Sequence, residues 1–218
     1  MMFVRHNGNR SGEGRFTKGK TYVAGIFEEG AAVSLGSMTL TDDSGREVRE
    51  GTESGRFDFM QFVYAVVVKP SNGLRLGDVV RLDETSPDGK MFRLGGVGCY
   101  YATDMFEILD WTNVVPGMRV MMLSSSEWVT VERINESIWL FLEGGEKYVS
   151  PESVRFAVID GGVAMGAFVR TGDKVNIKGL RGNAFYPIVR EDREEAKVLL
   201  KMENGNEMWF DSKRFEPM

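Results

Sequence analysis

The residue types that most often carry catalysis are scarce in this chain. His6 is the only histidine and Cys99 is the only cysteine. Nucleophilic catalysis needs a nucleophile beside an activating base, and a zinc site needs three or four His, Cys or acidic ligands close together. We therefore expect no catalytic residue, no metal site and no cofactor, and a role other than that of an enzyme.

The remaining reactive side chains have a simpler structural interpretation. Asp42 and Asp43 flank the turn at Ser44-Gly45, where an aspartate hydrogen-bonds the backbone of the turn itself. Cys99 stands beside Tyr100 in a stretch typical of a strand, where a free cysteine usually behaves as a small buried apolar residue. We expect structural roles for these three side chains, so the function must lie in the surface that the strands present.

Composition and hydropathy indicate an ordered chain without a membrane span. Of its 218 residues, 42% are hydrophobic and 27% are charged, which is typical of a globular protein. No apolar run approaches the ~18 residues that a transmembrane helix needs. The start of the chain lacks the apolar segment of a secretory signal, and a single cysteine excludes an internal disulfide framework. We expect a cytoplasmic protein without a membrane partner.

Charge is distributed unevenly along the chain. The first 20 residues hold five basic residues and one acid, a net charge of +4, which leaves −9 for the rest of a chain whose net charge is −5. Residues 1–16 are glycine-rich and charged, as is typical of a solvated, partly disordered leader. The other interpretation is a basic arm that contacts nucleic-acid phosphates.

A repeated pattern divides the chain into four segments. Each segment opens with a glycine followed by an apolar stretch, contains a glycine-bearing turn, and closes on a phenylalanine. The closing residues Phe57, Phe106, Phe156 and Phe215 follow the last glycine of the turn by 12, 10, 11 and 10 residues. Self-similarity of this kind indicates repeated small folding units.

Each segment has the pattern of short strands. In the fourth segment, apolar runs at 185–190, 197–202 and 207–210 surround the hairpin turn Asn204-Gly205. A polar break at 150–153 in the third segment, and at 211–213 in the fourth, is suited to one 3₁₀ turn. No stretch keeps a convincing helical period for more than about three turns. The sequence thus predicts an all-β protein with five short strands in a unit.

Five short strands, a long first loop and a single turn before the last strand resemble the Src-homology-3-like small barrel. The resemblance implies four tandem barrels packed in a row, at residues 17–68, 74–110, 114–160 and 168–218. The second unit is the shortest and departs furthest from the pattern. Residues 172–182 also resemble the KOW motif that such barrels carry in transcription elongation factors and ribosomal proteins, which implies a nucleic-acid contact through Lys178 and Arg181.

The connections between units differ in character. Residues 110–113 are too few for independent motion, and Trp111 is predicted to wedge between the second and third units. Residues 160–167 are glycine-rich, so they form either a hinge or a glycine-tolerant strand at a barrel junction. Barrels of about 50 residues bury too little surface to be robust alone, so we expect neighbours to pack together.

The chain has more aromatic residues than four small cores require. Neighbouring residues of a strand face opposite sides, so Tyr100 and Tyr101, or Trp209 and Phe210, cannot both be core. The outward member must face a neighbouring barrel or a partner, and exposed Tyr and Trp commonly anchor protein interfaces. The candidate protein-binding residues are Tyr101, Trp128, Trp139, Tyr148, Tyr186 and Trp209.

These observations favour a non-enzymatic protein-binding or adaptor protein that covers or bridges another protein. The alternative is a nucleic-acid or ribonucleoprotein binder with Arg5, Arg10, Arg15, Lys178 and Arg181 as contacts. A third interpretation is a cell-wall-binding array, against which the lack of an export signal counts. A compact row of small barrels would also suit a phage or mobile-element accessory protein whose partner is a host factor.

Overall fold

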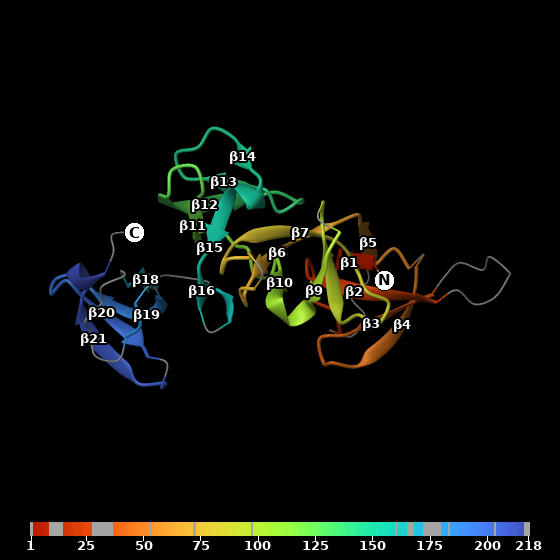
Figure 1. Ribbon diagram of the computed structural model, residues 1–218, viewed down its shortest axis with the longest axis horizontal. Coiled ribbons are helices and arrows are strands. Elements are labelled where there is room, and N and C mark those ends of the chain that lie inside the picture. Colours follow the sequence, from red (N-terminus) through yellow and green to blue (C-terminus); the bar gives the residue numbers. More distant parts are fainter. Residues whose placement is uncertain are drawn as a thin grey trace. The chain divides into compact units, whose positions relative to one another are not determined.

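The protein consists of β-strands and short 3₁₀ turns. The computed structural model describes residues 2–8, 15–27, 37–52, 54–71, 73–96, 98–159, 161–164, 168–171, 180–182, 184–202 and 204–215. Within these ranges the strands form five antiparallel sheets and no α-helix occurs (Figure 1). The predicted all-β class is therefore confirmed.

The first sheet uses the beginning of the chain as an inner strand. Its strands are β1 (Met2–His6), β2 (Thr21–Phe27), β3 (Ser37–Thr41), β4 (Glu47–Gly51) and β5 (Phe57–Met60), in the order β4-β3-β2-β1-β5. Val4 lies opposite Tyr22 on one side and Phe59 on the other. The prediction of a solvated leader at 1–16 therefore fails for residues 2–6. They form a strand because Phe3 and Val4 are apolar and both are fully buried.

The second sheet begins earlier than the sequence pattern predicts. It contains β6 (Val63–Val67), β7 (Val79–Thr85), β8 (Met91–Leu94), β9 (Tyr100–Ala102) and β10 (Phe106–Ile108), in the order β10-β6-β7-β8-β9. The predicted boundaries assign residues 63–67 to the first unit, whereas β6 pairs with β7 and β10. Every residue of β6 is buried, so the strand has no polar face that would reveal its sheet.

The second half of the chain forms two larger sheets and a small one. The third sheet contains β11 (Arg119–Met122), β12 (Trp128–Ile134), β13 (Leu140–Leu142), β14 (Tyr148–Val149) and β15 (Val154–Phe156), in the order β14-β13-β12-β11-β15. The hairpin of β16 (Val158–Ile159) and β17 (Gly162–Val163) follows. The fourth sheet contains β18 (Phe168–Arg170), β19 (Phe185–Asp192), β20 (Lys197–Lys201) and β21 (Glu207–Asp211), in chain order.

One strand order recurs in these sheets. In each of the first three, the strands lie in the order fourth, third, second, first, fifth, and the fourth sheet has the same order for its four strands. A 3₁₀ turn follows the fourth strand in three sheets: η1 (Thr103–Met105), η2 (Pro151–Ser153) and η3 (Ser212–Arg214). The turns predicted at 150–153 and 211–213 are thus confirmed, with Ser150 and Asp211 accepting hydrogen bonds from the backbone N–H two residues later.

The closing phenylalanines of the sequence repeat are core residues. Phe57, Phe106, Phe156 and Phe215 are exposed by 6%, 8%, 1% and 8%. Each follows the fourth strand of its sheet: Phe57, Phe106 and Phe156 lie in the fifth strand, and Phe215 follows η3. The closing phenylalanine therefore recurs in the sequence because each sheet buries one in its core.

The chain divides into two compact units, residues Met1–Val114 and Val115–Met218. In the first unit, β1 links the cores of the first two sheets, because Val4 packs in the first core and Phe3 in the second. The Phe3 ring lies 5.7 Å from that of Phe92. Each small sheet therefore depends on the other for part of its core.

In the second compact unit, an aromatic cluster joins the third and fourth sheets. The Trp128 ring of β12 lies 5.5 Å from Phe168 and 5.4 Å from Phe185, edge to face. Ala157 and Ala164, on either side of the β16–β17 hairpin, are buried in the same cluster. Of the two interpretations of residues 160–167, the described part, 161–164, fits the strand at a junction. Residues 160 and 165–167 lie outside the described ranges.

Candidate binding surface

Three sheets carry a matching row of side chains on the face away from the core. The row runs across the second, third and fourth strands at one register position, immediately after a bulge in the second strand. The second-sheet row is Glu84, Arg93 and Tyr100; the third-sheet row is Arg133, Phe141 and Tyr148; the fourth-sheet row is Arg190, Leu199 and Trp209. The fourth strand contributes an aromatic residue in all three.

The second-sheet row is held by polar contacts. Glu84 accepts a hydrogen bond of 2.6 Å from the Tyr100 hydroxyl, and its carboxylate lies 3.1 Å from Arg93. The hydrogen bond to the Glu84 carboxylate raises the pKa of Tyr100. Tyr100 is 43% exposed whereas Tyr101 packs against the core of the sheet. The alternation predicted for this pair is confirmed, with Tyr100 and not the candidate Tyr101 as the outward member.

The third-sheet row is a stack of rings and a cation. The Arg133 guanidinium lies 4.2 Å from the centroid of the Phe141 ring, and the Phe141 and Tyr148 rings meet edge to face at 5.4 Å. Trp139 stands two residues before Phe141 and is 39% exposed. Leu140 between them is buried, so alternation places Trp139 on the same side as Phe141.

The turn that presents Trp139 is strained. Ile138 has a φ of 63° and is 1% exposed, although a β-branched residue rarely adopts the left-handed conformation. In the second sheet, the corresponding turn has Gly89 at a φ of 70°. Asn135 closes the turn, because its Oδ1 accepts hydrogen bonds from the backbone N–H groups of Ser137 and Trp139. Ile138 therefore fills the core while its neighbour faces solvent.

The fourth-sheet row is the most exposed of the three. Trp209 is 44% exposed, while Phe210 beside it is buried, as alternation predicts. The neighbouring position pairs Lys197 of β20 with Asp211 of β21. Among the described residues, β21 is the edge of its sheet.

The candidate protein-binding residues separate into exposed and internal ones. Trp139 and Trp209 are exposed and Tyr148 is half-buried. Trp128 is half-buried and packs against Phe168 and Phe185 at a junction within the chain. Tyr186 is corrected: it is 3% exposed, because it lies on the inner face of β19.

The nucleic-acid candidates differ in their exposure to solvent. Arg5 lies in β1, is 7% exposed, and places its guanidinium 5.5 Å from the centroid of the Trp111 ring. Burial lowers the pKa of Arg5, while the carboxylates of Asp110 and Asp58 oppose this shift. Arg5 is therefore corrected from a phosphate contact to an interior residue. Arg15 and Arg181 are exposed, and Arg10 and Lys178 lie outside the described residues.

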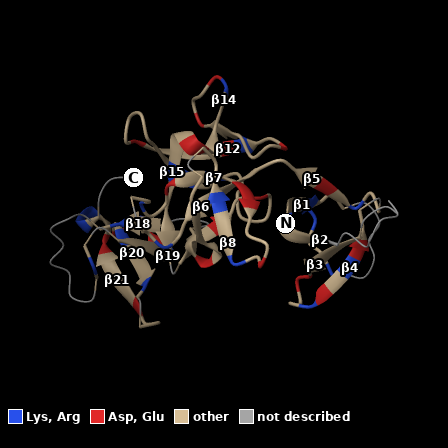
Figure 2. Cartoon of the chain, turned by 45° about the vertical axis from the view of Figure 1, so that its right-hand side comes forward, with Lys and Arg blue, Asp and Glu red and all other residues tan. Residues whose placement is uncertain are grey.

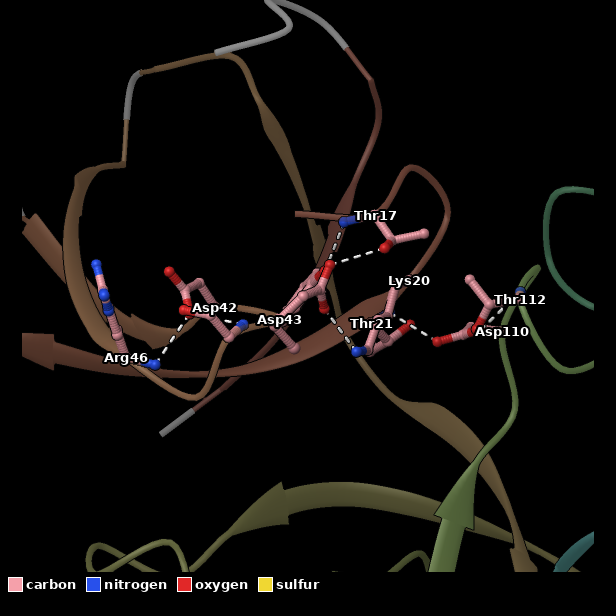
Figure 3. Close-up of polar contacts among 10 residues, drawn as sticks. Thr17, Lys20, Thr21, Asp42, Asp43, Arg46, Asp110 and Thr112 are labelled. Atoms are coloured by element: carbon pink, nitrogen blue, oxygen red, sulfur yellow. Dashed lines mark hydrogen bonds and ion pairs between the residues drawn. The ribbon is translucent and has the colours of Figure 1, made fainter. Parts of the chain in front are cut away.

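Trp111, the predicted wedge residue, packs against the first sheet beside Arg5. A Cβ added at Gly19 would lie 2.9 Å from the Cβ of Trp111. Next to it, Asp110 is buried and accepts a hydrogen bond of 2.8 Å from the backbone N–H of Thr21 (Figure 3). The segment after β10 therefore returns to cover β1 and β2.

The paired acids Asp42 and Asp43 have separate structural roles (Figure 3). Asp42 accepts hydrogen bonds from the backbone N–H groups of Ser44 and Arg46, so the predicted turn support is confirmed for this residue. Asp43 instead accepts hydrogen bonds from the side chains of Thr17, Lys20 and Tyr22. It fixes residues 17–20 before β2, and its hydrogen-bond partners differ from those of Asp42.

Two hydrogen bonds, each between residues five positions apart, reveal a repeat that the sequence pattern did not predict. The Tyr22 hydroxyl accepts a hydrogen bond of 2.8 Å from the backbone N–H of Thr17, and the Tyr186 hydroxyl accepts one of 2.8 Å from Arg181. Both tyrosines are the second residue of a second strand. The sequence signal is the tripeptide Phe-Val-Arg, which forms residues 3–5 of β1 and all of β18.

The reactive side chains do not assemble into a chemical site among the described residues. No group of three or more His, Cys, Asp or Glu in these ranges could hold a metal ion. His6 packs between Phe16 and Phe57, with ring centroids 6.0 and 5.3 Å away. Cys99 is exposed, so the expectation of a buried cysteine is wrong: it lies in the turn before β9 and not on the strand.

Comparisons with known proteins assign no family. No family model matches the chain, and no curated protein is similar to it at a significant level. Among the described residues, no helix has the length and hydropathy needed to span a bilayer. Figure 2 shows acidic and basic residues interspersed along the strands.

Proposed function

We propose that the protein is a non-enzymatic binding or adaptor protein whose partner is another protein. The observation that carries the proposal is the outward aromatic residue on the fourth strand of three sheets, Tyr100, Tyr148 and Trp209, together with Trp139. The cores of the second and fourth sheets contain their own phenylalanines and do not include Tyr100 or Trp209. Tyr and Trp with one face in solvent are enriched among interface anchors.

We propose further that the sheets are Src-homology-3-like barrels in a tandem array. The recurring strand order and the 3₁₀ turn after the fourth strand of three sheets support this. On this proposal the units span residues 2–60, 63–108, 119–156 and 168–215. Three of these four units present a similar outer row, so a partner could be covered or bridged at several similar positions.

The nucleic-acid alternative has less support. Its described, exposed contacts are Arg15 and Arg181, because Arg5 is buried in β1. With a net charge of −5, the chain as a whole repels phosphates, so binding to duplex DNA or RNA should vanish at physiological salt.

The test compares proteins captured by the wild-type chain with those captured by the double variant Trp139→Ala, Trp209→Ala. A direct partner should be retained by the wild type and lost with the variant, whose circular dichroism should be unchanged because both side chains are exposed. The matched control is Arg15→Glu, Arg181→Glu. If the charge reversal removes the bound material and the aromatic changes do not, the protein-partner proposal fails and the nucleic-acid alternative replaces it.

A further inference from the structure

We propose that the third-sheet aromatic face, formed by Arg133, Trp139, Phe141 and Tyr148, docks a basic, Arg- or Lys-bearing segment of a protein partner. This inference rests on the proposed function and assigns it a site and a partner chemistry. Three observations support it: a cation already stacked on the face, an acidic surround, and a turn that holds Trp139 in place.

The first observation is the stacked cation. The Arg133 guanidinium lies 4.2 Å from the Phe141 ring centroid, well within the ~6 Å at which the electron-rich face of a ring attracts a cation. Arg133 itself is exposed, so this contact forms at the surface. Arg133 thus shows that a ring of this face can stack with a guanidinium. Tyr148 and Trp139 are the rings that an incoming cation would meet.

The second observation is charge complementarity. The segment from β12 to β14 has four exposed acids, Glu132, Glu136, Glu143 and Glu146, against Arg133 and Lys147. The acids lie on β12, in the turn before β13 and in the turn before β14, around the strands that carry the rings. A basic segment would be attracted to this surround, whereas an acidic one would be repelled.

The third observation is that the face is fixed before binding. Asn135 bonds the backbone N–H of Trp139, and the backbone N–H of Asn135 donates to the Trp139 carbonyl. Next to it, the buried Ile138 itself adopts a left-handed conformation. The backbone at Trp139 therefore has little conformational freedom left to lose, which favours binding. A strained turn of this kind persists only where the surrounding structure over-determines it.

The other two rows lack this combination. In the second-sheet row, the Tyr100 hydroxyl and Arg93 are both bound to Glu84. In the fourth-sheet row, Leu199 stands where the third sheet has Phe141, so Trp209 has no aromatic neighbour in its row. The third sheet is therefore the one to which we assign the cation.

The experiment follows the four tryptophan indole N–H resonances of the full chain by ¹H–¹⁵N NMR. The probe is a dodecapeptide in which Arg alternates with Gly and Ser, and the control peptide has Glu in place of Arg. Only the Trp139 indole, assigned with Trp139→Phe, should shift saturably with the Arg peptide, and none should shift with the Glu peptide. Absence of a Trp139 shift, or an equal response to both peptides, overturns the proposal.

Variants then distinguish binding at the third-sheet aromatic face from non-specific electrostatic attraction of the Arg peptide. Tyr148→Ala should lower the affinity for the Arg peptide by about tenfold through loss of a ring contact. The double variant Glu143→Lys, Glu146→Lys should lower this affinity as strongly. Trp209→Ala, a tryptophan of similar exposure on the fourth sheet, should leave it unchanged. If Trp209→Ala weakens binding as much as Tyr148→Ala, the third-sheet assignment is wrong.

The two proposals fail in distinguishable ways. If proteins captured by the wild type depend on Trp209 and not on Trp139, the protein-binding function stands and the basic-segment site fails. If the Arg peptide binds at Trp139 but no captured protein depends on either tryptophan, the site stands as a cation-binding face and the adaptor proposal fails.

Discussion

At Ile138, the left-handed backbone predicts a reversal of the usual ranking of alanine and glycine. Both Ile138→Ala and Ile138→Gly lose the burial of the isoleucine, but only alanine keeps the strain of a φ near 63°. That strain costs an L-residue roughly 1–2 kcal/mol, more than the 0.5–1 kcal/mol entropic cost of glycine. Urea unfolding should therefore show the glycine variant to be the more stable of the two.

Gly89→Ala provides the control for this prediction, because Gly89 has a φ of 70° in the matching turn of the second sheet. It should lower the free energy of unfolding by about 1 kcal/mol. An alanine variant at 138 that is more stable than the glycine variant would show that the turn relaxes.

The Asp43 carboxylate should make stability depend on acid pH. Burial alone would raise the pKa of Asp43, but hydrogen bonds from Lys20, Thr17 and Tyr22 outweigh it and lower the pKa. The stabilisation by the ionised carboxylate is thus fully present above the pKa that an aspartate has in the unfolded chain, near 4. It is lost as the pH falls through the lower pKa of Asp43 in the folded chain. Asp43→Asn should cost about 1–2 kcal/mol at neutral pH, and the difference should shrink toward pH 2. Urea midpoints at pH 7 and pH 2 measure it; an equal difference at both would exclude the charge as the cause.

The strand β1 should be essential to the fold, because its two faces serve two cores. Phe3→Ala should lower the free energy of unfolding by about 3–5 kcal/mol, as removal of a fully buried phenylalanine does. Phe59→Ala, on the adjacent β5, should change it by less than about 0.5 kcal/mol, since Phe59 is 49% exposed. If Phe3→Ala left the free energy of unfolding in denaturant unchanged, the solvated-leader interpretation would be restored.

For the whole molecule, the two compact units predict which fragments fold. Residues 1–114 contain both cores that β1 joins, and they include Asp110, the acceptor for the Thr21 backbone N–H. This fragment should melt cooperatively with β-type circular dichroism, and so should 115–218. Residues 1–60 should not, because Phe3 loses the core that covers it. A cooperative melt of 1–60 would show that the first sheet is independent.

Much of the strand pattern was readable from the sequence. Glycine turns, closing phenylalanines and alternating residues are local signals, since turn geometry and strand faces depend on residues a few positions apart. They correctly predicted the all-β class, the 3₁₀ turns at 150–153 and 211–213, and the outward faces of pairs such as Trp209 and Phe210. They also found Trp139 and Trp209 as surface aromatics.

Only the tertiary structure shows whether an outward-facing side chain is exposed to solvent or covered by another segment. Phe3, Arg5 and Trp128 have local patterns that resemble those of solvent-facing or leader residues, yet each is covered by a segment distant in sequence. The fully buried β6 has no alternation to identify its sheet, and the strain at Ile138 is a property of backbone angles. A side chain is buried or exposed according to what packs over it, and that cover comes from contacts between residues far apart in the chain, which a local pattern does not encode.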